Sequence, residues 1–111
     1  MTLTDKTGAP VVVVKLTDRF TVGVAEGVVG LAAFAERDGQ RVFFHTEVAN
    51  AYGGRGLATM LIAEALKVTR TDGLRIVPVC PMVAAYVDKH HDYDDIVDKP
   101  TAAILRWLQG E

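Results

Sequence analysis

The chain has 111 residues, of which 50% are hydrophobic and 23% charged, and this balance is typical of one globular domain over residues 1–111. Its 12 basic side chains are outnumbered by 14 acidic ones and form no basic stripe, which disfavours a nucleic-acid partner. No run approaches the ~20 apolar residues of a membrane span, and no leader pattern opens the sequence. A single cysteine cannot form an internal disulfide, so we expect a cytoplasmic protein.

The first half of the sequence predicts β-strands. A β-branched run covers Val11–Leu16, and Phe20–Val24 alternates apolar residues with polar or small ones. Apolar residues return over Val28–Ala35, and an Asp-Gly pair then predicts a hairpin turn before the run Arg41–Val48. Tight turns between consecutive strands predict an antiparallel meander.

The second half changes to helical periodicity. Over Leu57–Arg70 the apolar residues recur every three or four positions, which is typical of an amphipathic helix packed on a sheet. Its predicted buried face consists of Ala58, Leu61, Ile62, Ala65, Leu66 and Val68. Leu74–Val79 predicts a short strand, expected to return parallel to Arg41–Val48 through a right-handed crossover. The order of elements predicts an α+β domain with helices on a mostly antiparallel sheet.

Two further helices are predicted toward the end of the sequence. Pro81 suits the first position of a helix whose inward residues are Val83, Tyr86 and Val87. The acidic stretch Asp92–Lys99 is expected to be irregular. Thr101–Gln109 predicts a terminal helix whose inward residues are Ile104, Leu105 and Leu108.

Three glycines in four positions, Gly53, Gly54 and Gly56, join the strand ending at Val48 to the first helix. Glycine lets backbone N–H groups approach a ligand closely, and the first turn of a helix leaves its N–H groups unpaired. Arg55 adds a positive charge. These features predict a phosphate-binding cradle, with an ordinary flexible connection as the alternative. Neither the Walker pattern nor G-x-G-x-x-G is present.

The glycine loop resembles the pyrophosphate-binding signature of the GNAT acetyltransferase superfamily, R/Q-x-x-G-x-G/A after a strand. Gly56 and Ala58 fill its last two positions, and Gly53 stands where Arg or Gln is usual, with Arg55 available to compensate. Other landmarks resemble a short YjdJ-type branch of GNAT-like domains, namely His45-Thr46-Glu47-Val48, Pro78-Val79-Cys80-Pro81-Met82-Val83, Tyr86 and His90-His91-Asp92-Tyr93. The resemblance covers about 20–97, and the helix at 101–109 is extra.

This resemblance implies a minimal GNAT-like fold that uses acetyl-CoA as co-substrate. The pyrophosphate is then expected on the loop's backbone N–H groups, and the pantetheine arm along the strand that ends near Val48. The implied cofactor-binding residues are Val48, Gly53, Gly54, Arg55, Gly56, Leu57, Ala58 and Thr59. A backbone N–H that polarises the acetyl carbonyl is worth ~3–4 kcal/mol in acyl transfer.

Cys80 is the first candidate for the chemistry. It follows a predicted strand and precedes Pro81 at a helix start, where the helix dipole lowers a thiol pKa. A thiolate at this position could accept the acetyl group and pass it on. The alternative is a small buried apolar residue, which is the usual role of a lone cysteine.

Three further side chains are candidates for acid–base chemistry. His45 and Glu47 share one face of their strand because side chains alternate, and a protonated amine acceptor needs such a base. A solvated polar face is the alternative. The resemblance implies that Tyr86 protonates the departing CoA thiolate, whereas its spacing alone indicates a core residue. No metal site is expected, because His90 and His91 are adjacent and diverge by about 100° on a helix.

The leading prediction is an acetyltransferase-like protein that passes acetyl from acetyl-CoA to an unidentified amine or thiol. The acceptor could be a small molecule, a peptide or a protein, and transfer could be direct or through Cys80. The alternative is a non-catalytic module that binds acyl-CoA or another protein. Full GNAT domains are usually larger, with extra N-terminal helices that wall the acceptor site. At 111 residues, the resemblance therefore implies an acceptor site that is open, shared across an interface, or missing.

Overall fold

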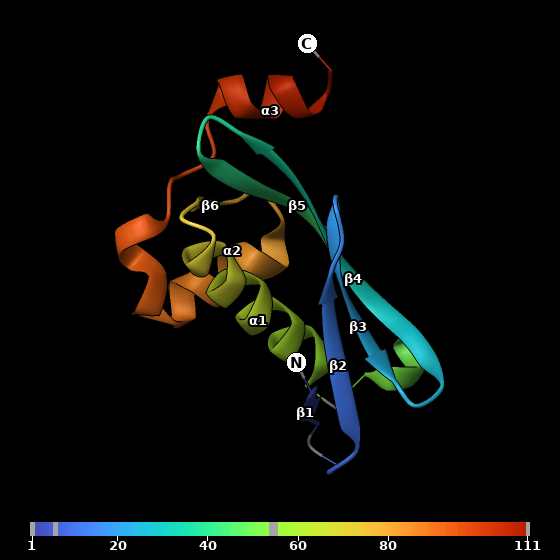
Figure 1. The fold of residues 1–111 in the computed structure, drawn as a ribbon. Coiled ribbons are helices and arrows are strands. Elements are labelled where there is room, and N and C mark those ends of the chain that lie inside the picture. Colours follow the sequence, from blue (N-terminus) through green and yellow to red (C-terminus); the bar gives the residue numbers. More distant parts are fainter. Residues whose placement is uncertain (1, 6, 54–55, 111) are drawn as a thin grey trace.

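The computed structural model describes residues 2–5, 7–53 and 56–110, and its framework is one six-stranded sheet (Figure 1). The strands are β1 (Thr2–Thr4), β2 (Pro10–Lys15), β3 (Arg19–Val24), β4 (Gly27–Arg37), β5 (Gln40–Val48) and β6 (Arg75–Pro78). They lie side by side in chain order, β1 to β5 antiparallel and β6 parallel to β5. This arrangement confirms the α+β fold with a mostly antiparallel sheet and the parallel return of the strand–helix–strand unit.

Helices cover the sheet unequally. They are α1 (Leu57–Thr71), α2 (Pro81–Lys89) and α3 (Ala102–Leu108), with the short 3-10 helices η1 (Asn50–Tyr52) and η2 (His91–Ile96). In Figure 1, α1 and α2 lie on one side of the strands, and α3 lies at the far end of the β4–β5 hairpin. We call the face covered by α1 and α2 the inner face, and the opposite face the outer face. Among the described residues, no helix is long and apolar enough to cross a membrane.

The core lies between α1 and the inner face. Phe20, Phe34 and Phe43 stand on three neighbouring strands, with ring centroids 5.3 to 6.2 Å apart. The helix packs onto these rings with its apolar face, whose buried members are Leu57, Leu61, Ile62, Ala65, Leu66 and Thr69. The periodicity therefore located the correct face of α1, although Ala58 and Val68 are only half-buried and Leu57 and Thr69 are buried as well.

A buried arginine completes the core. Arg41 is 1% exposed, and its guanidinium lies 4.8 Å from the ring centroid of Phe34. It donates hydrogen bonds to Glu36 Oε2 at 2.8 and 3.0 Å, to Asp72 Oδ2 at 3.0 Å and to Thr69 Oγ1 at 3.1 Å. These bonds tie β5 to β4 and to the end of α1, and they compensate the cost of burying the charge.

Four details differ from the sequence expectations. Leu105 is 42% exposed rather than inward, because the face of α3 that meets the sheet consists of Ile104, Trp107 and Leu108 at i, i+3, i+4 spacing. The stretch expected to be irregular contains η2. The strand β1 and the helix η1 were not predicted.

Candidate functional site

β5 and β6 separate half-way along β5. Their pairing runs from Gln40–Arg75 to Phe43–Pro78. The Phe43 carbonyl then accepts hydrogen bonds from the N–H groups of both Val79, at 3.0 Å, and Cys80, at 2.8 Å. No further pairing with β6 follows within the described residues, so the second half of β5 has a free edge. A free strand edge can hydrogen-bond an extended ligand.

A β-bulge lies at the same point of β5. Ala33 faces His45 and Phe34 faces Phe43, so Phe44 is the extra residue in the β4–β5 ladder. As a result, Phe44 and His45 are both exposed and Thr46 returns to the buried inner face. The bulge therefore turns His45 and Glu47 to the outer face, next to the gap between β5 and β6.

The glycine loop begins where β5 ends. The N–H of Ala49 donates to the Val29 carbonyl at 2.8 Å, which directs the chain away from the half-buried Val48 into η1. Beyond the loop, Gly56 is the N-cap of α1 with a left-handed backbone (φ 78°), a conformation that favours glycine. Gly54 and Arg55, two of the expected cofactor-binding residues, lie outside the described residues.

The start of α1 opens on a shallow pocket. No described side chain caps the helix, so the N–H groups of its first turn, at Leu57, Ala58 and Thr59, are available to a ligand. The pocket has a volume of about 330 Å³, and its lining residues are Val48, Ala49, Asn50, Tyr52, Gly53, Gly56, Leu57, Ala58 and Thr59. Every described residue of the expected cofactor-binding set is in this lining, which has no acidic side chain.

The backbone does not require glycine at Gly53. Its φ of −63° and ψ of 151° are open to any residue, but an added Cβ would lie 3.3 Å from the Asn50 carbonyl oxygen, a tight contact that requires a small shift of η1. Gly53 also lacks the side-chain donor that the usual Arg or Gln supplies at this position.

Cys80 lies on the inner side of the gap. It precedes Pro81 as the N-cap of α2, it is 3% exposed, and its Sγ lies 3.3 Å from Thr46 Oγ1, to which the thiol donates. Cys80 and Thr46 are 34 positions apart in the sequence, so their contact could not be predicted before the structure placed the end of β6 beside β5.

Tyr86 also lies on the inner side. It is half-buried and stacks on the His90 ring with centroids 4.4 Å apart. Burial raises the pKa of the Tyr86 phenol, and nearby Tyr93 and Asp92 raise it further. The phenol therefore stays protonated at neutral pH, which suits a proton donor and not a base.

His45 and Glu47 form a pair on the outer side. Their Nε2 and Oε2 atoms lie 3.6 Å apart, and their side chains are 57% and 62% exposed. The four candidate catalytic residues are thus divided between the two sides of the gap, with Cys80 and Tyr86 inside and this pair outside. No group of three or more potential metal ligands occurs in the described parts of the chain.

This arrangement of strand, gap and helix start agrees with the comparisons to known proteins. The sequence model of the GCN5-related N-acetyl-transferase family matches residues 19–96. The chain belongs to this family. The match begins with β3 and ends with η2, so it covers the bulge, the gap and the glycine loop, and it leaves out β1, β2 and α3.

A solved structure shows the same fold. It is an NMR solution structure of a GCN5-like protein of the N-acetyltransferase type from Staphylococcus aureus, with 18% sequence identity and a TM-score of 0.63. The likeness covers 82% of this GCN5-related domain and 91% of that chain. No curated protein sequence matches the chain significantly.

Proposed function

We propose that this GCN5-related domain transfers an acetyl group from acetyl-CoA to a primary amine. The observation that carries the proposal is the continuity between the uncapped first turn of α1 and the free edge of β5, two surfaces that meet at Val48. The first suits a pyrophosphate and the second suits the amide-containing pantetheine arm.

The two surfaces lead to the gap between β5 and β6. A ligand anchored at Leu57–Thr59 and extended along β5 would bring its thioester to the region of the bulge, where backbone N–H groups of the free edge are available to polarise its carbonyl. Because the strands part here, the thioester could be reached from both faces of the sheet. This access explains how candidate catalytic residues on opposite faces of the sheet can take part in one reaction.

The outer pair supplies the base in this scheme. Glu47, with His45 beside it, takes a proton from the ammonium, and the amine nitrogen attacks the thioester carbon. The C–S bond breaks as the C–N bond forms, the nitrogen releases its second proton to solvent, and Tyr86 gives its proton to the departing thiolate from the inner side and regains one from solvent. Tyr86 can act as this donor because its phenol is protonated at neutral pH, and burial, which raises its pKa, keeps it so.

Direct transfer is favoured over a route through Cys80. The thiol is 3% exposed and donates its hydrogen to Thr46, so neither its surface nor its proton is open to a ligand. Its contacts are those of a residue that packs the base of the gap.

The exposure of the outer pair favours a second candidate function, an acyl-CoA-binding module without turnover. A base that is more than half exposed shares its site with water, which weakens its electrostatic effect on a reacting amine. Both candidate functions use the same cofactor site, so only the presence or absence of turnover distinguishes them.

Release of CoA from acetyl-CoA in the presence of pooled primary amines tests the proposal. We expect amine-dependent release that falls roughly a hundredfold in Glu47→Gln, and much less in Glu64→Gln, which removes the same charge from α1. Intact-mass measurement should show no acetyl adduct on Cys80.

Two results would contradict this scheme. Binding of CoA without amine-dependent release would favour the module without turnover. An acetyl adduct that disappears in Cys80→Ser would show that transfer runs through the thiol.

A further inference from the structure

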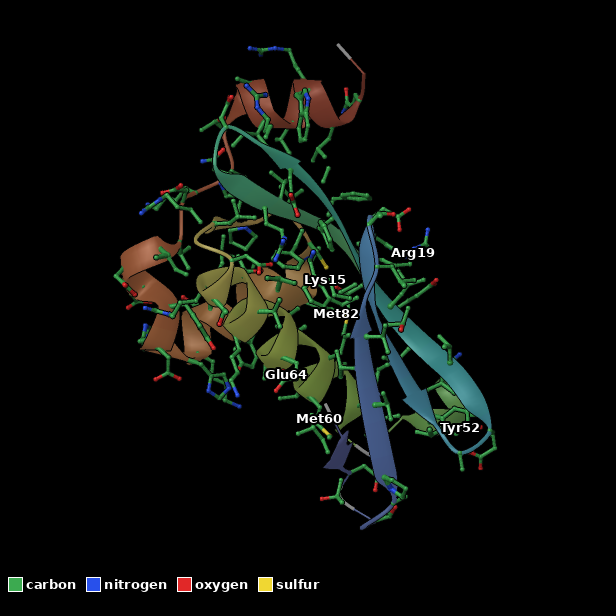
Figure 2. The ribbon with its side chains drawn as sticks, in the orientation of Figure 1. Lys15, Arg19, Tyr52, Met60, Glu64 and Met82 are labelled. Atoms are coloured by element: carbon green, nitrogen blue, oxygen red, sulfur yellow. The ribbon has the colours of Figure 1, made fainter. Side chains whose placement is uncertain are left out.

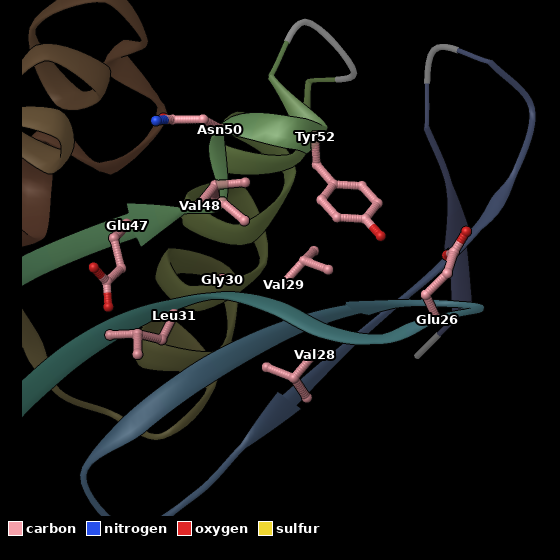
Figure 3. A pocket seen from close by; sticks show the side chains of 10 residues that line it. Glu26, Val28, Val29, Gly30, Leu31, Glu47, Val48, Asn50 and Tyr52 are labelled. Carbon is pink, nitrogen blue, oxygen red and sulfur yellow. The ribbon is translucent and has the colours of Figure 1, made fainter.

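We propose that the acceptor is a primary amine on an apolar chain that carries a second positive charge, bound in a cleft beside the outer pair. This inference rests on the proposed function and names the substrate class of the same site. The cleft has a volume of about 740 Å³ and lies between the end of β5, η1 and the β3–β4 hairpin (Figure 3).

The overhang of β4 creates this cleft. Pairing between β4 and β5 stops at Gly30–Val48, so Gly27–Val29 extends beyond the end of β5. The chain leaves β5 by the Ala49–Val29 hydrogen bond and forms η1, and the overhang and η1 become the two walls. At the floor, a Cβ on Gly30 would lie 2.7 Å from the Glu47 carbonyl oxygen, so glycine permits the close approach of the two strands.

The lining of the cleft is acidic at its ends and mainly apolar between them, with the Asn50 amide and the Tyr52 hydroxyl on the η1 wall. Figure 3 shows Glu47 beside Leu31 at one end and Glu26 at the other. Between the two ends lie Val29 and Val28, which is 68% exposed. The described lining contains no Lys, Arg or His side chain. Two carboxylates separated by apolar surface suit a chain with a cation at each end.

The wall formed by η1 separates opposite charges. Val48, Ala49, Asn50 and Tyr52 line both this cleft and the pocket at the start of α1. The α1 side offers backbone N–H groups and has no described acidic side chain, which suits the anionic cofactor. The cleft side carries both glutamates, which suits a cationic acceptor and repels a misplaced phosphate.

Each carboxylate then has a distinct task. Glu47 lies next to the gap and receives the ammonium that reacts. Glu26, in the β3–β4 turn, holds the far cation and acts as a specificity residue that does not touch the reacting atoms.

Three probes of equal chain length test this assignment. Diaminooctane, octylamine and aminooctanoate have a cationic, a neutral and an anionic far end. We expect the wild-type protein to bind diaminooctane most tightly in calorimetric titrations, with and without CoA, and to acetylate it with the highest kcat/KM. Glu26→Gln should lower this kcat/KM about two- to fivefold, mainly through KM, and should leave octylamine unchanged.

The control removes the same charge elsewhere on β4. Asp38→Asn, in the turn at the other end of this strand, should leave all three probes unchanged. Equal preference for the three probes, no binding of diaminooctane, or an effect of Glu26→Gln that Asp38→Asn reproduces would overturn the inference. Failure of the proposed function looks different, because CoA then fails to bind or no amine is acetylated.

Discussion

The burial of Arg41 is the clearest case of a residue whose environment differs from what its local sequence predicts. At the beginning of a strand, an arginine is ordinarily expected in solvent, and the sequence offers no sign that its partners Thr69 and Asp72 lie 28 and 31 positions away. Its burial follows from the crossover that returns the end of α1 to β5. The burial of Arg41 is therefore determined by the tertiary fold and not by the local sequence pattern.

Replacing Arg41 should destabilise the domain in a way that depends on the substitute. Arg41→Ala removes packing against Phe34 as well as four hydrogen bonds, and should lower the free energy of unfolding by about 2–4 kcal/mol. Arg41→Met keeps most of the volume, and the carboxylates of Glu36 and Asp72 remain partly exposed to water, so its cost should be less than half. Chemical denaturation measures both values.

The matched control is Arg19→Ala, which breaks an exposed ion pair with Asp18. Figure 2 shows Arg19 near Lys15, at the turn between β2 and β3. Its cost should be below about 1 kcal/mol. An Arg41→Ala cost no larger than this control would show that the buried network does not stabilise the fold.

Individual site residues were predictable to different degrees. Strand alternation placed His45 and Glu47 on one face, and the structure puts them there, although the bulge at Phe44 was not foreseen. The contact between Cys80 and Thr46, and the cleft at Glu26, could not be predicted, because each depends on which strand ends lie together. Their catalytic and binding roles remain predictions.

At the scale of elements, periodicity and turn residues located the main strands and helices to within a few residues. The Asp-Gly turn, the glycines beside α1 and Pro81 at the start of α2 are local signals, so they can be read without tertiary information. Leu105 illustrates the opposite case. The packed face of α3 consists of Ile104, Trp107 and Leu108, and the sequence does not show that the sheet meets this face rather than the side with Leu105.

The segment after η2 is attached to the sheet through Asp98. Its carboxylate accepts hydrogen bonds from Arg75 Nε at 2.8 Å and Nη2 at 2.9 Å and from Gln40 Nε2 at 2.9 Å. Its N–H donates to the Ile76 carbonyl at 2.8 Å, next to a parallel bridge between Ile76 and Val97. These contacts extend the sheet beyond β6 and fix the end of the family-matched region.

Acid should weaken this attachment. The hydrogen bonds from Arg75 and Gln40 lower the pKa of Asp98 below its unfolded value. The folded state therefore binds this proton less readily than the unfolded state, and the resulting stability is present above about pH 4 and is lost as the pH falls through the lowered pKa. The difference in unfolding free energy between wild type and Asp98→Asn, measured by denaturation, should be largest near neutral pH and shrink in acid.

Asp88→Asn, on the exposed side of α2, is the charge control and should show no such difference. A wild-type advantage over Asp98→Asn that stays constant from neutral to strongly acidic pH would contradict the assignment.

For the whole molecule, the order of elements was sufficient to predict the fold class, and the glycine loop with its neighbouring motifs was sufficient to predict the family. The expectation of an open acceptor side remains a prediction. On this side of the described sheet, η1 and the β3–β4 overhang form the cleft, and none of the described α-helices contributes a lining residue. In this arrangement the anionic cofactor and the cationic acceptor would bind on opposite sides of the η1 wall. Their reacting groups would meet at the gap between β5 and β6.

If the start of α1 holds CoA, calorimetric titration with CoA should detect binding at this site. Gly56→Ala forces a left-handed backbone onto alanine and shifts the first-turn N–H groups, so binding should weaken about tenfold or more. Gly73→Ala imposes the same backbone strain beyond the opposite end of α1, where φ is 75° and an added Cβ meets no atom, and should bind CoA as the wild type does. No binding of CoA to the wild type, or equal binding to both variants, would contradict the account.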